Sequence, residues 1–238
     1  MTELSSLHLY SHPLLTALLI CHFLSDYQLQ SQKIADFKNK DWSFFIKHMY
    51  GVAFPLLILM LFNPKFWIIF VIIFLSHALI DFLKPYLIKW FQLTQNLSFL
   101  IDQFLHLFVI VIVSHFDIED AFQLPISTHS LTIILFLVLI TKPSNISFKI
   151  LFGKFQPDQF EKMDTILGAG AIIGILERMI IGICIAIGQF SSIGLVFTAK
   201  SIARYNKIAE SPSFAEYYLI GSLFSILIVF TSYWICFL

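Results

Sequence analysis

Eight apolar stretches follow one another along the chain, and polar residues or proline-containing breaks separate them. A helix needs about 20 predominantly apolar residues to cross a bilayer, and most of these stretches approach that length. The pattern therefore predicts an all-α, polytopic integral membrane helix bundle with about eight transmembrane helices. The stretches cover residues 13–28, 43–62, 66–83, 97–113, 124–141, 165–189, 191–205 and 214–237.

The seventh stretch is the weakest of the eight, because Lys200 and Arg204 interrupt it. A re-entrant segment is the alternative there, and it would leave seven full spans. We expect two membrane halves of four helices each. Residues 1–123 carry a cluster of His and Asp residues, and residues 124–238 contain a glycine-rich helix and a basic inward end.

Composition supports the membrane class. Hydrophobic residues make up 58% of the 238-residue chain and charged residues only 13%, about half of the roughly 25% typical of globular proteins. This balance excludes a disordered chain and an ordinary soluble domain. The 15 basic and 15 acidic residues cancel, so no net charge favours nucleic acid. Membrane lipids are the predicted partners, and the sequence leaves protein partners and oligomeric state open.

The positions of the basic residues orient the chain, because Lys and Arg accumulate in cytoplasmic loops. With eight alternating helices, 13 of the 15 basic residues fall on one side, while Lys65 falls on the other and Arg178 lies within a span. The sequence therefore predicts that both termini lie outside and that the basic loops face the cytoplasm.

Three of the first four predicted helices carry a His and an Asp four residues apart. Residues at this spacing share one face of a helix, so each pair can point toward a common centre. The order within each pair reverses with the predicted direction of the helix, which places every Asp nearer the cytoplasm and the His layer about 6 Å deeper. His48 of the second helix would join the Asp layer. The pairs are His22 with Asp26, His77 with Asp81, and Asp102 with His106.

Ionisable residues inside a membrane are costly and indicate function by default. Imidazole nitrogens and carboxylate oxygens suit zinc, iron or manganese, so the pairs predict a divalent transition-metal site. Carboxylates that do not bind metal, together with His48, would orient ligands or act as a general base. The competing interpretation is a set of His–Asp hydrogen bonds that hold the bundle together. The predicted metal ligands are His22, His77, His106, Asp26, Asp81 and Asp102, and the predicted catalytic residues are Asp26, Asp81, Asp102 and His48.

The second half carries its own buried charges. Glu177 and Arg178 lie near the middle of the sixth helix, and Glu216 opens the eighth helix at the predicted level of Lys200 and Arg204. Structural ion pairs between these helices are one interpretation. The other is that Lys200 and Arg204 bind an anionic headgroup or a phosphate. Close helix packing explains the pair Gly170 and Gly174.

The polar motifs of the first half are HFLSDYQLQ at residues 22–30, SHALIDFLK at 76–84 and IDQFLHL at 101–107. They resemble an uncharacterised family of bacterial polytopic membrane proteins catalogued as domain of unknown function 3307. GILER at 174–178, AKSIAR at 199–204 and AEYYLIGSLFS at 215–225 are similar to the C-terminal region of longer members. The resemblance implies a multi-pass protein of a bacterial cytoplasmic membrane and brings no established reaction with it.

The sequence leaves three functions open. The first is an intramembrane metal-dependent hydrolase that acts on a lipid or lipid-like phosphoester, because a metal activates water at neutral pH. The second is an ion- or proton-coupled transporter or channel, since chains of Asp and His also relay protons. The third is a non-catalytic membrane scaffold that binds a partner through its basic loops.

Overall fold

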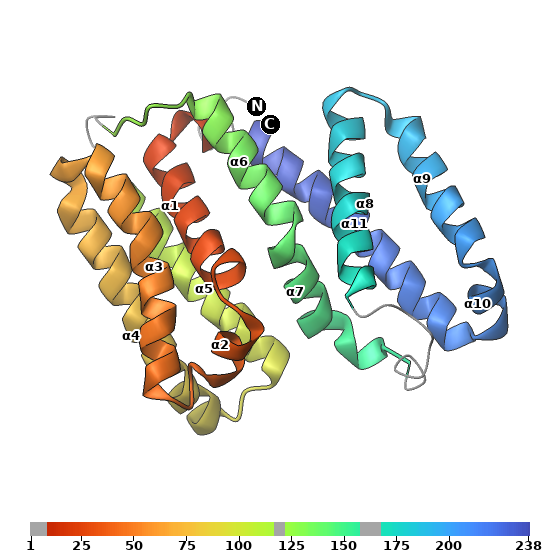
Figure 1. The fold of residues 1–238 in the computed structure, drawn as a ribbon, viewed down its shortest axis with the longest axis horizontal. Helices are drawn as coiled ribbons and strands as arrows, with labels where there is room; N and C mark the ends of the chain where they lie inside the picture. The colour runs from red at the N-terminus through yellow and green to blue at the C-terminus, as the bar shows by residue number, and fades with distance from the viewer. Residues whose placement is uncertain (1–8, 117–121, 158–167) are drawn as a thin grey trace. The chain divides into compact units, whose positions relative to one another are not determined.

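The fold is all-helical over the residues that this computed structural model describes, which are 9–116, 122–157 and 168–238. The predicted fold class is confirmed. The main helices are α1 (Pro13–Phe23), α2 (Gln32–Phe37), α3 (Trp42–Phe62), α4 (Trp67–Phe91), α5 (Gln95–Ser114), α6 (Thr128–Ile140), α7 (Lys142–Phe152), α8 (Ala169–Ala186), α9 (Phe190–Ala203), α10 (Tyr205–Glu210) and α11 (Pro212–Phe237) (Figure 1). Short 3-10 turns and one π-helical turn, η3 (Leu24–Gln28), join or extend them.

Six segments in the described ranges are long and apolar enough to cross a membrane. They are Trp42–Phe62, Pro64–Phe91, Gln95–Ser114, Thr128–Phe155, Ala169–Ala186 and Pro212–Phe237. The predicted count of about eight is therefore not confirmed. The first predicted span continues from α1 into η3 and reaches only about 24 Å, less than the roughly 30 Å hydrocarbon core. The seventh, α9, is also short, and the first residues of the predicted sixth helix lie outside the described residues.

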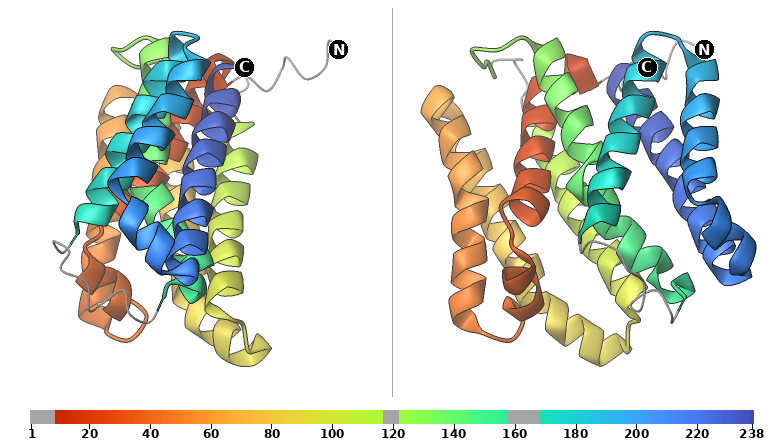
Figure 2. Two further views of the ribbon diagram at one scale, coloured as in Figure 1. Left: turned by 90° about the vertical axis from the view of Figure 1, so that its right-hand side faces the viewer. Right: turned by 45° about the vertical axis from the view of Figure 1, so that its right-hand side comes forward.

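Residues Met1–Val138, with Phe237, form one compact unit, and Leu139–Cys236, with Leu238, form a second. These units divide the chain within α6, and the two four-helix membrane halves, residues 1–123 and 124–238, stay a prediction. In the first unit α1 contacts α3 and α5, and α4 also contacts α3 and α5. The four helices therefore close into a ring, which can be followed in the red, orange and yellow ribbons of Figures 1 and 2.

The ring is polar inside and apolar outside. Leu61 is 80% exposed and Phe104 is 64% exposed on its outer surface, whereas His48 is 2% and Asp81 is 1% exposed inside it. A soluble protein of this size rarely exposes so much contiguous apolar surface, but lipid tails would cover it in a bilayer. The arrangement places the ionisable residues where the helices face one another.

A π-helical turn ends the first helix and carries part of the polar cluster. The Leu29 backbone N–H donates to the carbonyl oxygen of Leu24 at 2.8 Å, five residues back. The Ser25 hydroxyl donates to the carbonyl oxygen of Cys21 at 2.7 Å and lies 3.2 Å from that of Gly51 in α3. The extra residue of a π turn rotates the following side chains, and such turns occur frequently at functional sites.

The short helix α2 connects α1 to α3 and packs against α3. Its N-terminus is capped by the Ser31 hydroxyl, which accepts from the Ile34 N–H, and the Asp41 carboxylate caps α3 by accepting from the Ser43 N–H at 2.8 Å. Lys38 follows the last residue of α2 and is only 8% exposed. This connection therefore returns a lysine toward the interior of the ring.

In the second unit α8 contacts α7 and α9. The Phe148 ring of α7 packs at a tilt against the Tyr217 and Phe224 rings of α11, with centroid distances of 5.5 and 5.4 Å. The predicted glycine packing holds at only one of two positions. A Cβ at Gly174 would lie 3.3 Å from Asn145 Oδ1 of α7, whereas a Cβ at Gly170 would meet nothing within 4 Å.

Candidate metal centre

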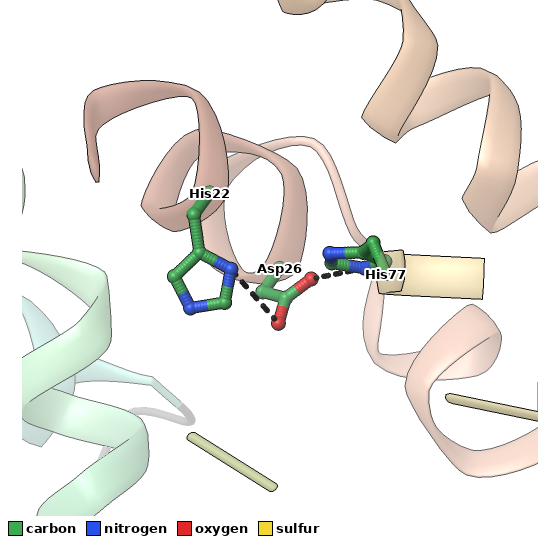
Figure 3. Close-up of side chains that lie close together, drawn as sticks. All are labelled: His22, Asp26 and His77. Carbon is green, nitrogen blue, oxygen red and sulfur yellow. Dashed lines mark ion pairs between the residues drawn. The ribbon is translucent and has the colours of Figure 1, made fainter. Parts of the chain in front are cut away.

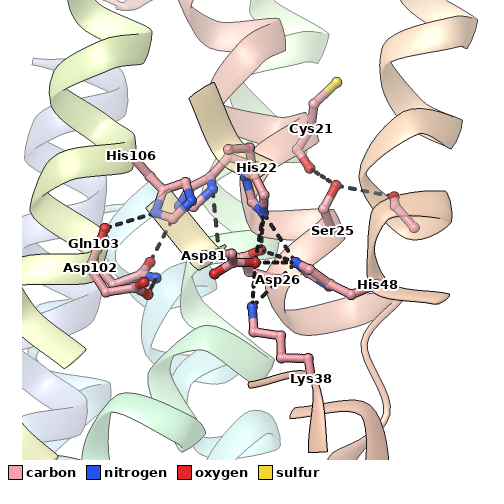
Figure 4. A network of polar contacts seen from close by, with 12 residues as sticks. Cys21, His22, Ser25, Asp26, Lys38, His48, Asp81, Asp102, Gln103 and His106 are labelled. Carbon is pink, nitrogen blue, oxygen red and sulfur yellow. Dashed lines mark hydrogen bonds and ion pairs between the residues drawn. The ribbon is translucent and has the colours of Figure 1, made fainter. Parts of the chain in front are cut away.

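The ring encloses a cluster of buried ionisable side chains that includes all the His and Asp residues predicted for the site. Each of them is at most 7% exposed. They come from α1, η3, α3, α4 and α5, so five elements contribute to one interior (Figure 4). The cluster consists of His22, Asp26, His48, His77, Asp81, Asp102 and His106, with Lys38 beside them.

Four ligand-type atoms converge most closely, and we call their residues, Asp26, His48, His77 and Asp81, the quartet. The His48 Nε2 atom lies 3.0 Å from Asp81 Oδ2, 3.1 Å from His77 Nε2 and 3.5 Å from Asp26 Oδ1. The His77 Nε2 atom lies 3.2 Å from Asp26 Oδ1 and 3.5 Å from Asp81 Oδ2. Tetrahedral coordination with bonds of about 2.0–2.1 Å places neighbouring ligand atoms about 3.3–3.4 Å apart. The His–His and His–Asp spacings of the quartet, 3.0 to 3.5 Å, bracket that value.

Lys38 contacts two atoms of the quartet. Its Nζ lies 2.8 Å from Asp81 Oδ2 and 3.3 Å from His48 Nε2. Burial alone lowers the pKa of the Lys38 ammonium, but the nearby Asp81, Asp26 and Asp102 carboxylates raise its pKa above the usual value. The lysine therefore remains charged and partly neutralises the carboxylates.

Asp26 faces histidines on both sides. Figure 3 shows its two oxygens directed toward different imidazoles, with Oδ1 near His77 Nε2 at 3.2 Å and Oδ2 near His22 Nδ1 at 3.7 Å. The π-helical turn η3 carries Asp26 and places its carboxylate between these two imidazoles. Asp26 therefore links the α3–α4 side of the cluster to the α1–α5 side.

Hydrogen bonds fix the orientation of the α5 side chains. The His106 Nδ1–H donates to the backbone carbonyl oxygen of Asp102 at 2.8 Å. The Asp102 Oδ2 atom lies 3.1 Å from Lys84 Nζ and accepts from Gln103 Nε2 at 3.1 Å. The amide oxygen of Gln103 then accepts from His22 Nε2 at 3.3 Å. These contacts hold His22 and His106 in defined ring orientations.

Several buried polar atoms of the cluster have no hydrogen-bond partner among the described residues. Buried polar groups are nearly always paired, so such atoms are candidate ligands for an ion or a water molecule. The residues also form three overlapping groups whose ligand atoms lie within 4.8 Å of one another: His22–Asp26–His77, His48–His77–Asp81 and Asp26–Asp102–His106. The partnerless atoms are His22 Nδ1, His48 Nδ1, Asp81 Oδ1, Asp102 Oδ1 and His106 Nε2.

A small cavity of about 20 Å³ lies against the His layer. His22, His77 and His106 line one part of it, and mostly apolar side chains such as Val52 and Ile73 line the rest, together with two serines. A volume of this size holds about one water molecule. The histidines therefore face a water-sized space with apolar walls.

The charged residues of the second unit form a separate set of contacts. Lys200 Nζ lies 2.6 Å from Glu177 Oε2 and donates to the Ser222 hydroxyl at 3.2 Å. The Arg178 guanidinium donates to the Ile140 carbonyl oxygen at the end of α6 and to Asn145 Oδ1 at 2.6 Å. This arrangement satisfies carbonyl groups that a helix C-terminus leaves unpaired. Glu177 thus pairs with one of the two cations considered from sequence, and neither Arg204 nor Glu216 forms an ion pair with a described residue.

Sequence reasoning missed two contributors to the cluster. Lys38 lies in a loop with Lys33 and Lys40, and nothing in its spacing separates it from them. Gln103 gave a usable signal, because a glutamine beside Asp102 in an apolar span needs a polar partner. Its link between Asp102 and His22 supplies that partner.

Residues 14–135 match the sequence profile of a protein family described as protein of unknown function (DUF3307). The match covers more than half of the chain. The chain belongs to this family. In this DUF3307 protein the matched region contains the whole His/Asp cluster and Lys38, and the second unit lies entirely outside it. No curated protein and no solved structure matches the chain.

Proposed function

We propose that this DUF3307 protein is an intramembrane metal-dependent hydrolase that cleaves a lipid or lipid-like phosphoester. The convergence of the four quartet atoms is the observation that carries the proposal. Two imidazole nitrogens and two carboxylate oxygens form a donor set suited to zinc, iron or manganese. The His–His and His–Asp spacings of 3.0 to 3.5 Å match those of neighbouring ligands around one ion.

The residues have distinct roles in this proposal. A bound divalent metal supplies Lewis acidity and activates water for attack on an ester at neutral pH. The Asp81 Oδ1 atom has no hydrogen-bond partner among the described residues, so it is the proposed general base. The Lys38 ammonium, 2.8 Å from Asp81 Oδ2, would stabilise negative charge that develops on a phosphoryl oxygen.

The surroundings favour a substrate with an apolar tail. The ring presents apolar side chains to the lipid phase, and the small cavity beside the His layer has apolar walls. A phosphate near Lys38 and an apolar chain along the outer surface together describe a lipid phosphoester. Headgroup binding by the second unit stays part of the proposal, with Arg204 as its main cation because Lys200 pairs with Glu177.

We further propose that the protein resides in a bacterial cytoplasmic membrane with both termini outside. The clustering of basic residues on one predicted side supports this orientation. A topology reporter fused after Leu238 should read as external. A cytoplasmic signal would contradict the proposed orientation.

Phosphate release from lipid vesicles tests the proposed reaction. Purified protein would be reconstituted with dioleoyl phosphatidic acid or dioleoyl phosphatidylglycerol, and the water-soluble products would be measured. Wild type and His115→Ala should hydrolyse at least one lipid, whereas His77→Ala should not. His115 is the matched control because it is exposed at the end of α5, where its Nδ1–H donates to the Val111 carbonyl oxygen. Equal rates in His77→Ala and wild type would contradict the proposal.

A second candidate function is a proton- or ion-coupled transporter. A continuous series of ionisable side chains supports it, because Lys38, Asp81 and His77 lie in contact and Asp26 connects them to His22. Such series relay protons in membrane pumps and transporters. Proton flux in liposomes that disappears in Asp81→Asn, without lipid hydrolysis by wild type, would favour this candidate over the hydrolase.

A further inference from the structure

The α1–α5 side of the cluster holds ligand-type atoms that the quartet does not use. We propose that they bind a second divalent metal, with the Asp26 carboxylate as a bridge between the two ions. This inference rests on the proposed function, because it places the second ion beside the quartet. The second site consists of His22 Nδ1, Asp26 Oδ2, Asp102 Oδ1 and His106 Nε2.

His106 presents a lone pair to this site. A backbone carbonyl oxygen can only accept, so the hydrogen bond to the Asp102 carbonyl places the ring proton on His106 Nδ1. The Nε2 atom of a neutral ring then carries a lone pair. That atom has no partner among the described residues, and His106 is 3% exposed. Hydrogen bonding of one ring nitrogen to a carbonyl is the usual arrangement for a metal-binding histidine.

His22 is oriented in the same way from the neighbouring helix α1. Its Nε2–H donates to the amide oxygen of Gln103 at 3.3 Å, which leaves the lone pair of a neutral ring on Nδ1. Within the described part of the chain Nδ1 has no hydrogen-bond partner, and it lies 3.7 Å from Asp26 Oδ2. The His22 and His106 rings are stacked with centroids 5.1 Å apart. Two helices therefore supply one free imidazole nitrogen each to the same region.

The carboxylates complete the donor set. Asp102 Oδ2 contacts Lys84 and Gln103, which leaves Oδ1 without a partner among the residues described. Ligand atoms of Asp26, Asp102 and His106 lie within 4.8 Å of one another. Asp26 directs Oδ1 toward His77 and Oδ2 toward His22 (Figure 3). One carboxylate thus offers an oxygen to each site, as the carboxylates of dinuclear helical-bundle centres do.

Two ions make phosphoesters the favoured substrate class over carboxylic esters. Metal pairs about 3.5–4 Å apart stabilise both the attacking and the leaving oxygen when a phosphorus centre is displaced in line. Charge leads to the same class. The three Asp carboxylates of the cluster carry three negative charges, and the ammonium groups of Lys38 and Lys84 carry two positive charges, which leaves one net negative charge. Two divalent ions would therefore create a positive excess, and an anionic phosphoester would balance it.

Metal stoichiometry and electron paramagnetic resonance of Mn²⁺-loaded protein test the inference. Wild type and the exposed control His115→Ala should each bind two Mn²⁺ per chain and give an exchange-coupled spectrum. His106→Gln and His48→Ala should each keep one ion and give a mononuclear spectrum, with folding checked by circular dichroism.

The possible outcomes separate this inference from the proposed function. One Mn²⁺ per wild-type chain would overturn the second site and leave the quartet intact. No bound metal in wild type would overturn both. A folded His106→Gln protein that keeps two ions, or loses both, would contradict the assignment of His106 to the second site alone.

Discussion

Replacement of Lys38 by Met should increase the affinity of the quartet for divalent metal. The Lys38 Nζ atom lies 2.8 Å from Asp81 Oδ2 and 3.3 Å from His48 Nε2, and both atoms are proposed metal ligands. The ammonium and the metal therefore compete for the same atoms. Two unit charges about 4 Å apart interact with about 4 kcal/mol at an effective dielectric constant of 20, so a divalent ion beside an unmoved ammonium is opposed by about 8 kcal/mol.

The measured gain should be smaller, because the lysine side chain can move away when metal binds. We expect at least about a tenfold lower metal Kd in Lys38→Met, which corresponds to about 1.4 kcal/mol. In the absence of metal the same variant should be less stable by about 3–5 kcal/mol, since loss of one partner leaves a buried carboxylate uncompensated. Metal at 100 times its Kd should restore about 2.7 kcal/mol.

Calorimetric titration with Mn²⁺ and thermal unfolding in detergent, each with and without metal, measure these effects. Lys40→Met is the matched control, because Lys40 lies two residues away and is exposed. It should change neither the affinity nor the stability appreciably. A folded Lys38→Met protein that binds Mn²⁺ no more tightly than wild type would refute the competition between ammonium and metal.

Three further predictions concern the packing at Gly174, the orientation of the ligands by Gln103 and the effect of metal removal. Gly174→Ala should destabilise the protein by about 1–3 kcal/mol in thermal unfolding. The added Cβ would lie 3.2 Å from an Arg178 nitrogen and 3.3 Å from Asn145 Oδ1, and the hydrogen bonds of the guanidinium resist its displacement. Gly170→Ala on the same helix should be neutral or stabilising, and equal effects of the two substitutions would contradict this difference in packing. Gln103→Leu should weaken Mn²⁺ binding about 10–100-fold through loss of the contacts to Asp102 and His22, and an unchanged Kd would show that Gln103 does not orient the ligands. Chelator treatment should lower the Tm of wild type, and restored Mn²⁺ should raise it again in a concentration-dependent manner; a Tm that does not respond to either would contradict a structural contribution of the metal.

The sequence predicted the His/Asp cluster better than the course of the first helix. The four-residue spacing of His77 and Asp81 places them on one face of α4, and in the structure that face points toward the interior of the ring. The shortest contacts between His and Asp side chains, however, join different elements, such as His48 with Asp81 at 3.0 Å and His77 with Asp26 at 3.2 Å. Spacing within a helix carries no information about which neighbour a side chain meets.

Two local features also lay beyond a periodic pattern. The π turn at residues 24–28 inserts one residue per turn without changing the apolar character of the stretch, so hydropathy cannot detect it. In the sequence nothing distinguishes Lys38 from an ordinary loop lysine, and only the path of α2 brings it into the ring. The pairing of Glu177 with Lys200 depends in the same way on the packing between α8 and α9.

X-ray absorption spectroscopy of protein purified without chelator tests the metal centre most directly. The proposed ligands predict a bound transition metal with nitrogen and oxygen neighbours at about 2.0–2.2 Å. The spectrum should also contain outer-shell scattering from imidazole rings, and this scattering should decrease in His77→Ala and persist in His115→Ala. A His/Asp metal site in the ring would be contradicted if the wild-type protein held no transition metal. It would also be contradicted if the bound metal showed no scattering from imidazole rings.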